Sequence, residues 1–362
     1  MEIGYLKLLN FRSYSNLEIN FSSTINIFYG NNGVGKTNLV EGIYVLALTK
    51  SFRTIHDKYL IMKGKNVSKI EGVIKTNTKT NYKVILNEEG KKVKINNNKV
   101  DKISDYISKI NIVLFHPDDM KIIKDTPSIR RKMLNIELSQ LNNNYLMYLS
   151  GYNKILKQRN AYLKQVFING NSSTEYLNIL TNKLIDYGIE ISNARKKYIG
   201  LINEYISKIY KDIALVGELK VKYISDFKDK SKDEILENYK KVYQKEMAFG
   251  KTILGIHHDD IDFFLDNNKL KDWGSEGQLK NSVIAFKLSE IKIIKKIKKE
   301  NPVLILDDLF SELDNEKINN ILNLIGSDIQ TFITTTDISK IKHDILDNSK
   351  IFKITESGIE EE

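Results

Sequence analysis

The sequence of 362 residues contains no cysteine, which excludes disulfide bonds, thiolate metal sites and a cysteine nucleophile. It contains only three prolines, and none lies between Pro127 and Pro302, so long helices are permitted in the middle of the chain. No apolar run approaches the ~18 residues that a membrane-spanning helix needs. The N-terminus lacks the charged and then apolar segments of an export signal. We therefore expect a cytoplasmic protein of two or three domains with no membrane partner.

Acidic residues are in the minority, with 46 Asp and Glu against 56 Lys and Arg, and the formal net charge is +10. Such an excess favours polyanionic partners, because a protein that binds nucleic acid releases the condensed counterions. A general bias of the composition towards Lys, Ile and Asn would give the same excess without a function. The charge alone leaves both interpretations open.

Glycine gathers in residues 30–37, which read Gly-Asn-Asn-Gly-Val-Gly-Lys-Thr. An apolar run at 25–29 precedes this segment, and residues 39–46 after it have helical spacing. Strand, glycine-rich loop and helix in this order predict a P-loop, whose backbone N–H groups surround a phosphate at the positive end of the helix dipole. A chance glycine-rich turn before a helix is the alternative. The predicted phosphate-binding residues are Gly30, Asn31, Asn32, Gly33, Val34, Gly35, Lys36 and Thr37.

Two side chains of this loop have predicted chemical roles. Lys36 would reach the outer phosphates and take part in catalysis, and Thr37 would bind Mg²⁺ through its hydroxyl. Around the loop, apolar spacing predicts strands within residues 3–28 and an antiparallel meander over 67–100, beside the nucleotide. A further buried strand is expected at 110–115, closed by His-Pro-Asp-Asp at 116–119.

The middle of the chain predicts a helical arm. Apolar residues recur in alternate steps of four and three over 134–166, with Arg159 as the one exception, and a second seam of this kind runs over 177–205. A break at 169–171 and a capping box, Ser172 with Glu175, separate them. Two such helices joined by a short turn fold back antiparallel. We expect the tyrosines on the seams to lie in the core.

Basic residues of the arm outside the seams are candidates for contacts with DNA phosphates, although solvated helix faces explain most of them. They are Lys154, Lys157, Arg159, Lys164, Arg195, Lys196 and Lys197, with Arg130, Arg131 and Lys132 at the root of the arm. Beyond the arm, a strand at 219–223 and a helix at 234–248 are expected. The His-His-Asp-Asp run at 257–260 is a poor metal site, because neighbouring residues of an extended chain point in opposite directions.

Three C-terminal stretches complete the candidate site. Residues 274–278, Gly-Ser-Glu-Gly-Gln, place a serine cap before a helix, where free N–H groups can meet an anion. Residues 303–308 form a buried strand that ends in Asp307 and Asp308, as in a Walker B motif. Asp307 would support Mg²⁺, and Asp308 would orient and polarise the attacking water. Residues 311–314, Ser-Glu-Leu-Asp, follow, and a strand at 330–337 ends in hydroxyls and an acid, where Thr335 could sense a γ-phosphate or simply form a polar strand end.

The order of these motifs resembles an ABC-type ATPase head of the SMC kind and, more narrowly, the RecF family of bacterial recombination mediators. The matching stretches span nearly the whole chain and lie at residues 9–14, 30–41, 50–53, 115–119, 127–131, 250–260, 274–278, 306–314 and 334–336. The sequence departs from the family at 255–260, where Gly-Ile-His-His-Asp-Asp replaces Gly-Pro-His-Arg-Asp-Asp, and at Asn135, where an acid is usual. It also lacks a transporter-type switch histidine at 334–337.

The resemblance implies an α/β fold, an ABC-type P-loop ATPase head with an antiparallel β subdomain and an inserted antiparallel helical arm. It implies three parts: the N-terminal part of the head at 1–118, the arm at 119–249 and the C-terminal part of the head at 250–362. Two heads would enclose two ATP molecules with Mg²⁺, each held by one P-loop and by signature residues of the other copy. The further nucleotide-binding residues are Ser275, Gly277, Gln278, Asp314 and Thr335.

Hydrolysis at Asp308 would then release the homodimer from DNA as a slow, DNA-dependent switch. In the family this clamp acts at the nucleoid on single-stranded, gapped or junction DNA, with RecR and RecO as partners. It assists recombinase loading, replication restart and SOS induction. Two alternatives stay open: a nucleotide-binding DNA scaffold with negligible turnover, and the ATP subunit of a membrane transporter. The arm, the missing switch histidine and the basic charge count against the transporter.

Overall fold

The computed structural model describes residues 1–169, 174–312 and 314–362. The predicted helix break and capping box at 169–175 fall partly outside these ranges, and Leu313 of the Ser-Glu-Leu-Asp stretch lies outside them. The chain forms two compact units, which are described separately. The first consists of residues 1–119 and 283–362, and the second of residues 120–282.

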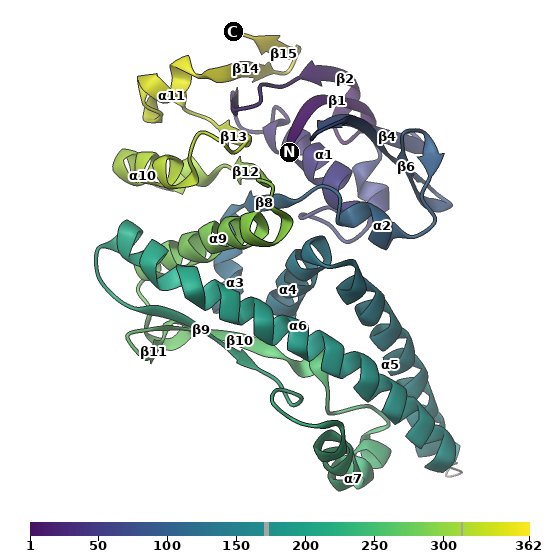
Figure 1. Cartoon of the computed structure of the whole chain (residues 1–362). Coiled ribbons are helices and arrows are strands. Elements are labelled where there is room, and N and C mark those ends of the chain that lie inside the picture. The colour runs from purple at the N-terminus through teal and green to yellow at the C-terminus, as the bar shows by residue number, and fades with distance from the viewer. Residues whose placement is uncertain (170–173, 313) are drawn as a thin grey trace. The chain divides into compact units, whose positions relative to one another are not determined.

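A mostly parallel sheet organises the first unit (Figure 1), with the strand order β15-β14-β3-β13-β12-β8. All neighbours pair parallel except β14 and β15, which pair antiparallel. The carboxyl ends of parallel strands meet at one edge of a sheet, which is where ligands bind in open α/β folds. The strands are β3 (Ile25–Tyr29), β8 (Ile112–Phe115), β12 (Val303–Asp307), β13 (Thr331–Thr335), β14 (Ser349–Thr355) and β15 (Gly358–Glu361).

A second, antiparallel sheet has the order β2-β1-β4-β5-β6-β7, which confirms the predicted meander. Its strands alternate buried and partly exposed positions, most clearly in β4 and β5, as expected when one face covers the core. The strands are β1 (Glu2–Phe11), β2 (Tyr14–Asn20), β4 (Val67–Lys75), β5 (Lys79–Asn87), β6 (Gly90–Ile95) and β7 (Asn98–Lys99).

Helix α1 (Lys36–Leu48) contacts strands of both sheets, among them β13 and β12 of the parallel sheet and β4, β5 and β1 of the antiparallel one. This explains why residues 39–48 are all buried rather than apolar on one face only. Gly42 lets the helix approach β1, because a Cβ atom there would lie 2.9 Å from the side chain of Leu8. The core thus holds the helix that begins at the P-loop.

The remaining features of the first unit are an aromatic cluster, four further helices and four short 3₁₀ turns. Phe21, Phe28, Phe332 and Phe352 form one aromatic cluster, in which Phe21 meets Phe332 edge-on at 4.8 Å between ring centroids. The helices are α2 (Ile103–Ile107), α9 (Glu276–Lys298), which begins in the second unit, α10 (Asn315–Ile325) and α11 (His343–Asp347). Short 3₁₀ turns lie at Asp57–Leu60, Pro117–Met120, Leu309–Glu312 and Ile338–Lys340.

The second unit consists mainly of helices, with one small antiparallel sheet in the order β11-β10-β9. Figure 1 shows α5 and α6 side by side over a long stretch, with α7 beside them. Its elements are α3 (Lys121–Lys124), α4 (Pro127–Leu141), α5 (Asn143–Asn169), α6 (Thr174–Ala214), β9 (Leu219–Ile224), α7 (Lys232–Phe249), a 3₁₀ turn (Ile256–His258), β10 (Asp260–Leu265), β11 (Asn268–Lys269) and α8 (Leu270–Trp273).

The antiparallel helical pair is confirmed, since Tyr162 meets Tyr176 and Arg159 bonds to Thr181 across α5 and α6. The first seam, however, belongs to two helices rather than one. Asn142 has an extended backbone, and its Oδ1 accepts a hydrogen bond from the Asn144 N–H. An asparagine in this role caps a new helix, so α4 ends and α5 begins at this residue.

Three ion pairs connect α4, α5 and α6 to α7 and to the segment that follows it. Arg159 is 1% exposed, and its guanidinium lies 2.5 Å from Glu246. The guanidinium of Arg195 lies 2.6 Å from Asp259, and Arg130 binds Asp260 with two hydrogen bonds. The segment after residue 249 belongs to this unit, because β10 pairs with β9 and α8 contacts β10 and α3. The unit therefore extends to residue 282, whereas the sequence places the end of the arm at residue 249.

These contacts correct one prediction. Arg130, Arg159 and Arg195 are buried and paired, so they cannot reach DNA phosphates, whereas Lys154, Lys157, Lys164, Lys196 and Lys197 are exposed. The α/β fold class, the antiparallel β subdomain and the helical arm are confirmed. Over the described residues, no helix combines the length and the apolar character that a membrane crossing requires.

Candidate nucleotide-binding site

The P-loop follows β3 and leads directly into α1, as predicted. Gly30, Gly33 and Gly35 all have positive φ angles, of 151°, 87° and 111°. Gly30 is also required by space, because a Cβ atom there would lie 2.2 Å from the carbonyl oxygen of Ile354. The loop can therefore turn its backbone around an anion only with glycine at these positions.

Lys36 lies within this loop. Its Nζ donates hydrogen bonds of 2.7 Å to the carbonyl oxygens of Gly30 and Asn31. Burial lowers the pKa of Lys36, and the nearby carboxylates of Asp308 and Asp307 act in the opposite direction. The ammonium group is thus held at the mouth of the loop, where it could exchange two carbonyl partners for phosphate oxygens.

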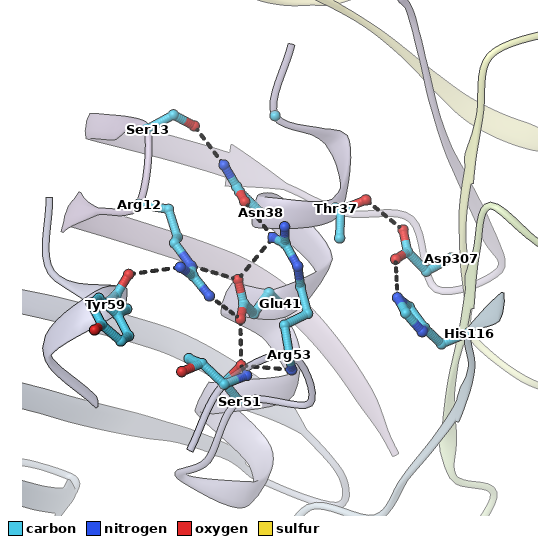
Figure 2. A network of polar contacts seen from close by, with 12 residues as sticks. Arg12, Ser13, Thr37, Asn38, Glu41, Ser51, Arg53, Tyr59, His116 and Asp307 are labelled. Atoms are coloured by element: carbon cyan, nitrogen blue, oxygen red, sulfur yellow. Dashed lines mark hydrogen bonds and ion pairs between the residues drawn. The ribbon is translucent and has the colours of Figure 1, made fainter. Parts of the chain in front are cut away.

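Asp307, at the end of β12, is the centre of the polar contacts at this edge. Its Oδ1 accepts a 3.0 Å bond from the Thr37 hydroxyl and a 2.7 Å bond from the Thr334 hydroxyl, and its Oδ2 lies 3.7 Å from His116 Nε2. Figure 2 shows Thr37 and His116 on either side of the carboxylate. The residue is 1% exposed, and burial raises the pKa of its carboxyl group while the hydroxyl of Thr334 and the His116 ring lower it.

His116 was not predicted as a site residue, although it stands in the closing turn of a buried strand. The Asp118 N–H donates to its Nδ1 at 3.1 Å, which assigns the ring proton of the neutral form to Nε2, the nitrogen that faces Asp307. The ring packs against Phe52 with 5.1 Å between centroids. Its orientation is therefore fixed from two sides.

Asp308 adopts a left-handed backbone, with φ of 51°, which is uncommon outside glycine. Its N–H donates a 2.9 Å hydrogen bond to the Thr334 hydroxyl, the same hydroxyl that donates to Asp307. The predicted threonine, Thr335, lies on the next position of β13, and its hydroxyl bonds to the backbone of Asp337. Thr334 therefore supports the two acids, and a phosphate-sensing role for Thr335 stays a prediction.

A second polar network lies beside the first turns of α1 (Figure 2). Glu41 is fully buried and accepts two hydrogen bonds from Arg12, of 2.8 and 2.7 Å, and one from the Ser51 hydroxyl. Arg53 donates to Asn38 at 2.9 Å. The sequence reasoning missed this network. The sign of it in the sequence was Glu41, a single glutamate within the apolar run 39–48.

The signature residues belong to the second unit and form a turn of their own. The Ser275 hydroxyl accepts a 3.3 Å hydrogen bond from the Gln278 N–H, and the Gln278 side chain accepts a 2.9 Å bond from the Ser275 N–H. These reciprocal bonds cap α9. A Cβ atom on Gly277 would meet nothing within 4 Å, so this face of the turn is open. Asp314 caps α10 by accepting a 2.8 Å bond from the Lys317 N–H.

The residues present suit a magnesium nucleotide. Mg²⁺ prefers oxygen ligands and usually keeps water and substrate phosphates in its shell, and Thr37 and Asp307 supply two oxygens beside the phosphate loop. Within the described ranges, no group of three or more His, Cys, Asp or Glu side chains could hold a metal by itself.

His257 belongs to the run at 257–260 that the sequence makes a poor metal site. It contacts the Tyr152 hydroxyl at 2.7 Å, and burial lowers the pKa of its ring to about 4.

The fold and this site define the class: an ABC-type ATPase head of the SMC kind. The RecF/RecN/SMC N-terminal domain model matches residues 2–358. The DNA replication and repair protein RecF of Oceanobacillus iheyensis is 38% identical over 99% of this chain and 100% of its own length. The solved structure of the recombination mediator protein RecF with ATP is 28% identical, with a TM-score of 0.90 over 99% of this chain and 97% of that one.

An SMC head bound to a domain of ScpA shares the fold at 16% identity, with a TM-score of 0.56 over 99% of this chain and 96% of that one. This chain belongs to the RecF family.

Proposed function

We propose that this protein binds ATP with Mg²⁺, forms a homodimer when ATP is bound, and uses slow hydrolysis to leave DNA during recombinational repair. One observation carries the proposal. Thr37, His116 and Thr334 come from three distant parts of the chain and meet at Asp307, directly beside the lysine of the phosphate loop. This arrangement suits a metal-bound triphosphate better than it suits a structural ion pair.

ATP binding would use the chain's own groups in a defined way. The N–H groups of the P-loop and of the first turn of α1 would face the phosphates, and Lys36 would move from the Gly30 and Asn31 carbonyls to phosphate oxygens. Mg²⁺, when bound by Thr37 and Asp307, would neutralise charge that develops on the phosphates. The solved relative is a RecF protein with ATP, which supports this choice of nucleotide.

Hydrolysis would depend on Asp308. Its carboxylate is the candidate that orients and polarises the attacking water, and its backbone is fixed by the bond to Thr334. A DNA scaffold with negligible turnover would need the same nucleotide pocket without this role. Replacement of Asp308 by asparagine separates the two, because it keeps the shape of the side chain and removes its charge.

Dimerisation would complete the pocket. In the family arrangement, Ser275, Gly277 and Gln278 of a second copy would approach the phosphates held by the first copy, with Asp314 and Thr335 as further nucleotide contacts. The open face of Gly277 and the N-terminus of α9 suit an anion. ATP would then act as the link between two copies of the chain.

DNA and the partner proteins follow from the family. The relatives are named DNA replication and repair proteins, and the solved relative is assigned to the RecFOR pathway. We infer that this chain acts with RecR and RecO on single-stranded, gapped or junction DNA, and that it assists recombinase loading, replication restart and SOS induction. A net charge of +10 supports a polyanionic partner.

The nucleotide assignment can be tested with one lysine and a matched control. Lys36→Ala should lose ATP binding in isothermal titration with Mg²⁺, because it removes the cation that faces the phosphates. Lys63→Ala removes the same charge from an exposed position of the same unit and should bind ATP as the wild type does. Full ATP affinity in Lys36→Ala would contradict the P-loop assignment.

A further inference from the structure

A hollow of about 530 Å³ lies on the helical arm between α5 and α6. From α5 it is lined by Gly151, Lys154, Ile155 and Gln158, whose spacing of three, four and seven residues puts them on one helix face. From α6 it is lined by Lys183, Asp186 and Tyr187, which share a face for the same reason. None of these residues belongs to the nucleotide site.

The hollow is built around a close contact between the two helices. A Cβ atom on Gly151 would lie 2.7 Å from the ring of Tyr187, so only glycine lets this ring lie against the α5 backbone. Tyr187 is half-buried there and also meets Tyr148, with 6.4 Å between ring centroids. It is therefore a seam residue of the arm that still contributes aromatic surface to the hollow.

The charges around the hollow are unequal. Lys154 and Lys183 are exposed, and neither has an ion-pair partner among the residues that the structure describes. The one acid, Asp186, accepts a 2.6 Å hydrogen bond from Lys232. Two uncompensated cations and the amide of Gln158 therefore face the hollow, which favours an anionic ligand.

We propose that this hollow binds a short stretch of single-stranded nucleic acid, with backbone phosphates at Lys154 and Lys183 and a base against Tyr187. A cationic groove with an aromatic ring is the combination that binds single strands without sequence preference. A duplex keeps its bases stacked on one another and could use only the lysines. The inference rests on the proposed DNA-binding function and assigns part of it to the arm.

The test uses the full-length protein with Mg²⁺ and ATP, and a fluorescent oligothymidylate whose anisotropy is followed against salt concentration. Each phosphate contact with a single strand contributes about 0.7 to the slope of log affinity against log salt. The double variant Lys154→Ala/Lys183→Ala should therefore lower the slope by about 1.4, which is about a 25-fold loss of affinity at 0.1 M salt.

Two controls distinguish a specific site from a general effect of charge, and the aromatic ring of Tyr187 from its hydroxyl. Lys208→Ala/Lys211→Ala removes two exposed charges from α6 outside the hollow, and should change the slope much less. Tyr187→Leu should weaken binding about tenfold without changing the slope, because stacking releases no counterions, whereas Tyr187→Phe should bind normally. Circular dichroism melting of each variant checks that the arm remains folded.

Failure of the hollow as a binding site and failure of the proposed DNA-binding function give different results. A wild-type protein that binds no DNA would contradict the proposed function as a whole. If both lysine variants lose the same affinity, or if Lys154→Ala/Lys183→Ala binds as the wild type does, the hollow is not the site. If Lys154→Ala/Lys183→Ala loses affinity for duplex DNA and keeps its affinity for oligothymidylate, the assignment to single strands is wrong.

Discussion

Thr334 offers the sharpest test of how the two acids are held, because one hydroxyl serves both. It donates to Asp307 at 2.7 Å and accepts from the Asp308 N–H at 2.9 Å. Thr334→Val keeps the shape of the side chain and removes both bonds. Thr334→Ser is the matched control, since it keeps the hydroxyl and loses one methyl group.

The expected magnitude follows from these two bonds. A hydrogen bond to a charged group contributes about 1.5–3 kcal/mol, and an unsatisfied buried N–H costs about 1–3 kcal/mol. Because one hydroxyl carries both, the losses are not additive, and we expect Thr334→Val to lower stability by about 2–4 kcal/mol. If about 2 kcal/mol of this loss falls on the placement of Asp308, ATP turnover decreases about 30-fold.

The assay combines urea unfolding with steady-state ATP turnover at saturating Mg²⁺. Thr334→Ser should lose about 1 kcal/mol of stability and most of the wild-type turnover should remain. Thr335→Val belongs in the same series, because it tests the phosphate-sensing role predicted for the neighbouring threonine. Wild-type turnover in Thr334→Val would refute the argument that its hydroxyl positions Asp308.

Two further predictions concern the second unit. Burial lowers the pKa of His257 from 6.5 to about 4, so the unfolded chain binds more protons between these values, and stability should fall by up to about 3 kcal/mol as the pH decreases from 7 to 4. Urea unfolding of His257→Gln should show a flatter pH dependence than the wild type, whereas the exposed-site control His56→Gln should not; equal slopes in all three would contradict the burial argument. Trp273, the only tryptophan, is 81% exposed and lies two residues before Ser275, so its emission should shift to the blue when ATP forms the dimer but not with ADP. Unchanged emission in a preparation that sediments as a dimer would place Trp273 outside the interface.

The features predicted correctly from the sequence are those encoded locally. The glycine positions of the P-loop require positive φ angles that few other residues adopt, and a buried strand that ends in two acids is readable without any partner. The P-loop follows β3, and Asp307 ends β12, and both strands belong to the same parallel sheet. The contact between Thr37 and Asp307 therefore follows once the strand order is known.

The features that the sequence did not reveal depend on register and on distant partners. Asp307 pairs with Thr334 in the parallel register, and this pairing determines which threonine supports the acids. Arg159 and Arg195 resemble surface cations in the sequence, because their partners Glu246 and Asp259 lie far along the chain. Arg159 is a charged residue within an otherwise apolar seam, and this was the sign in the sequence of a buried ion pair.

The measurement closest to the central claim is sedimentation of the Asp308→Asn variant with saturating Mg²⁺ and ATP, with and without gapped DNA. Because this variant should bind ATP without cleaving it, we predict a stable dimer with ATP and a monomer with ADP. A protein that remains monomeric with ATP and gapped DNA, while titration shows that ATP is bound, would contradict the proposal that the nucleotide joins two copies of this chain.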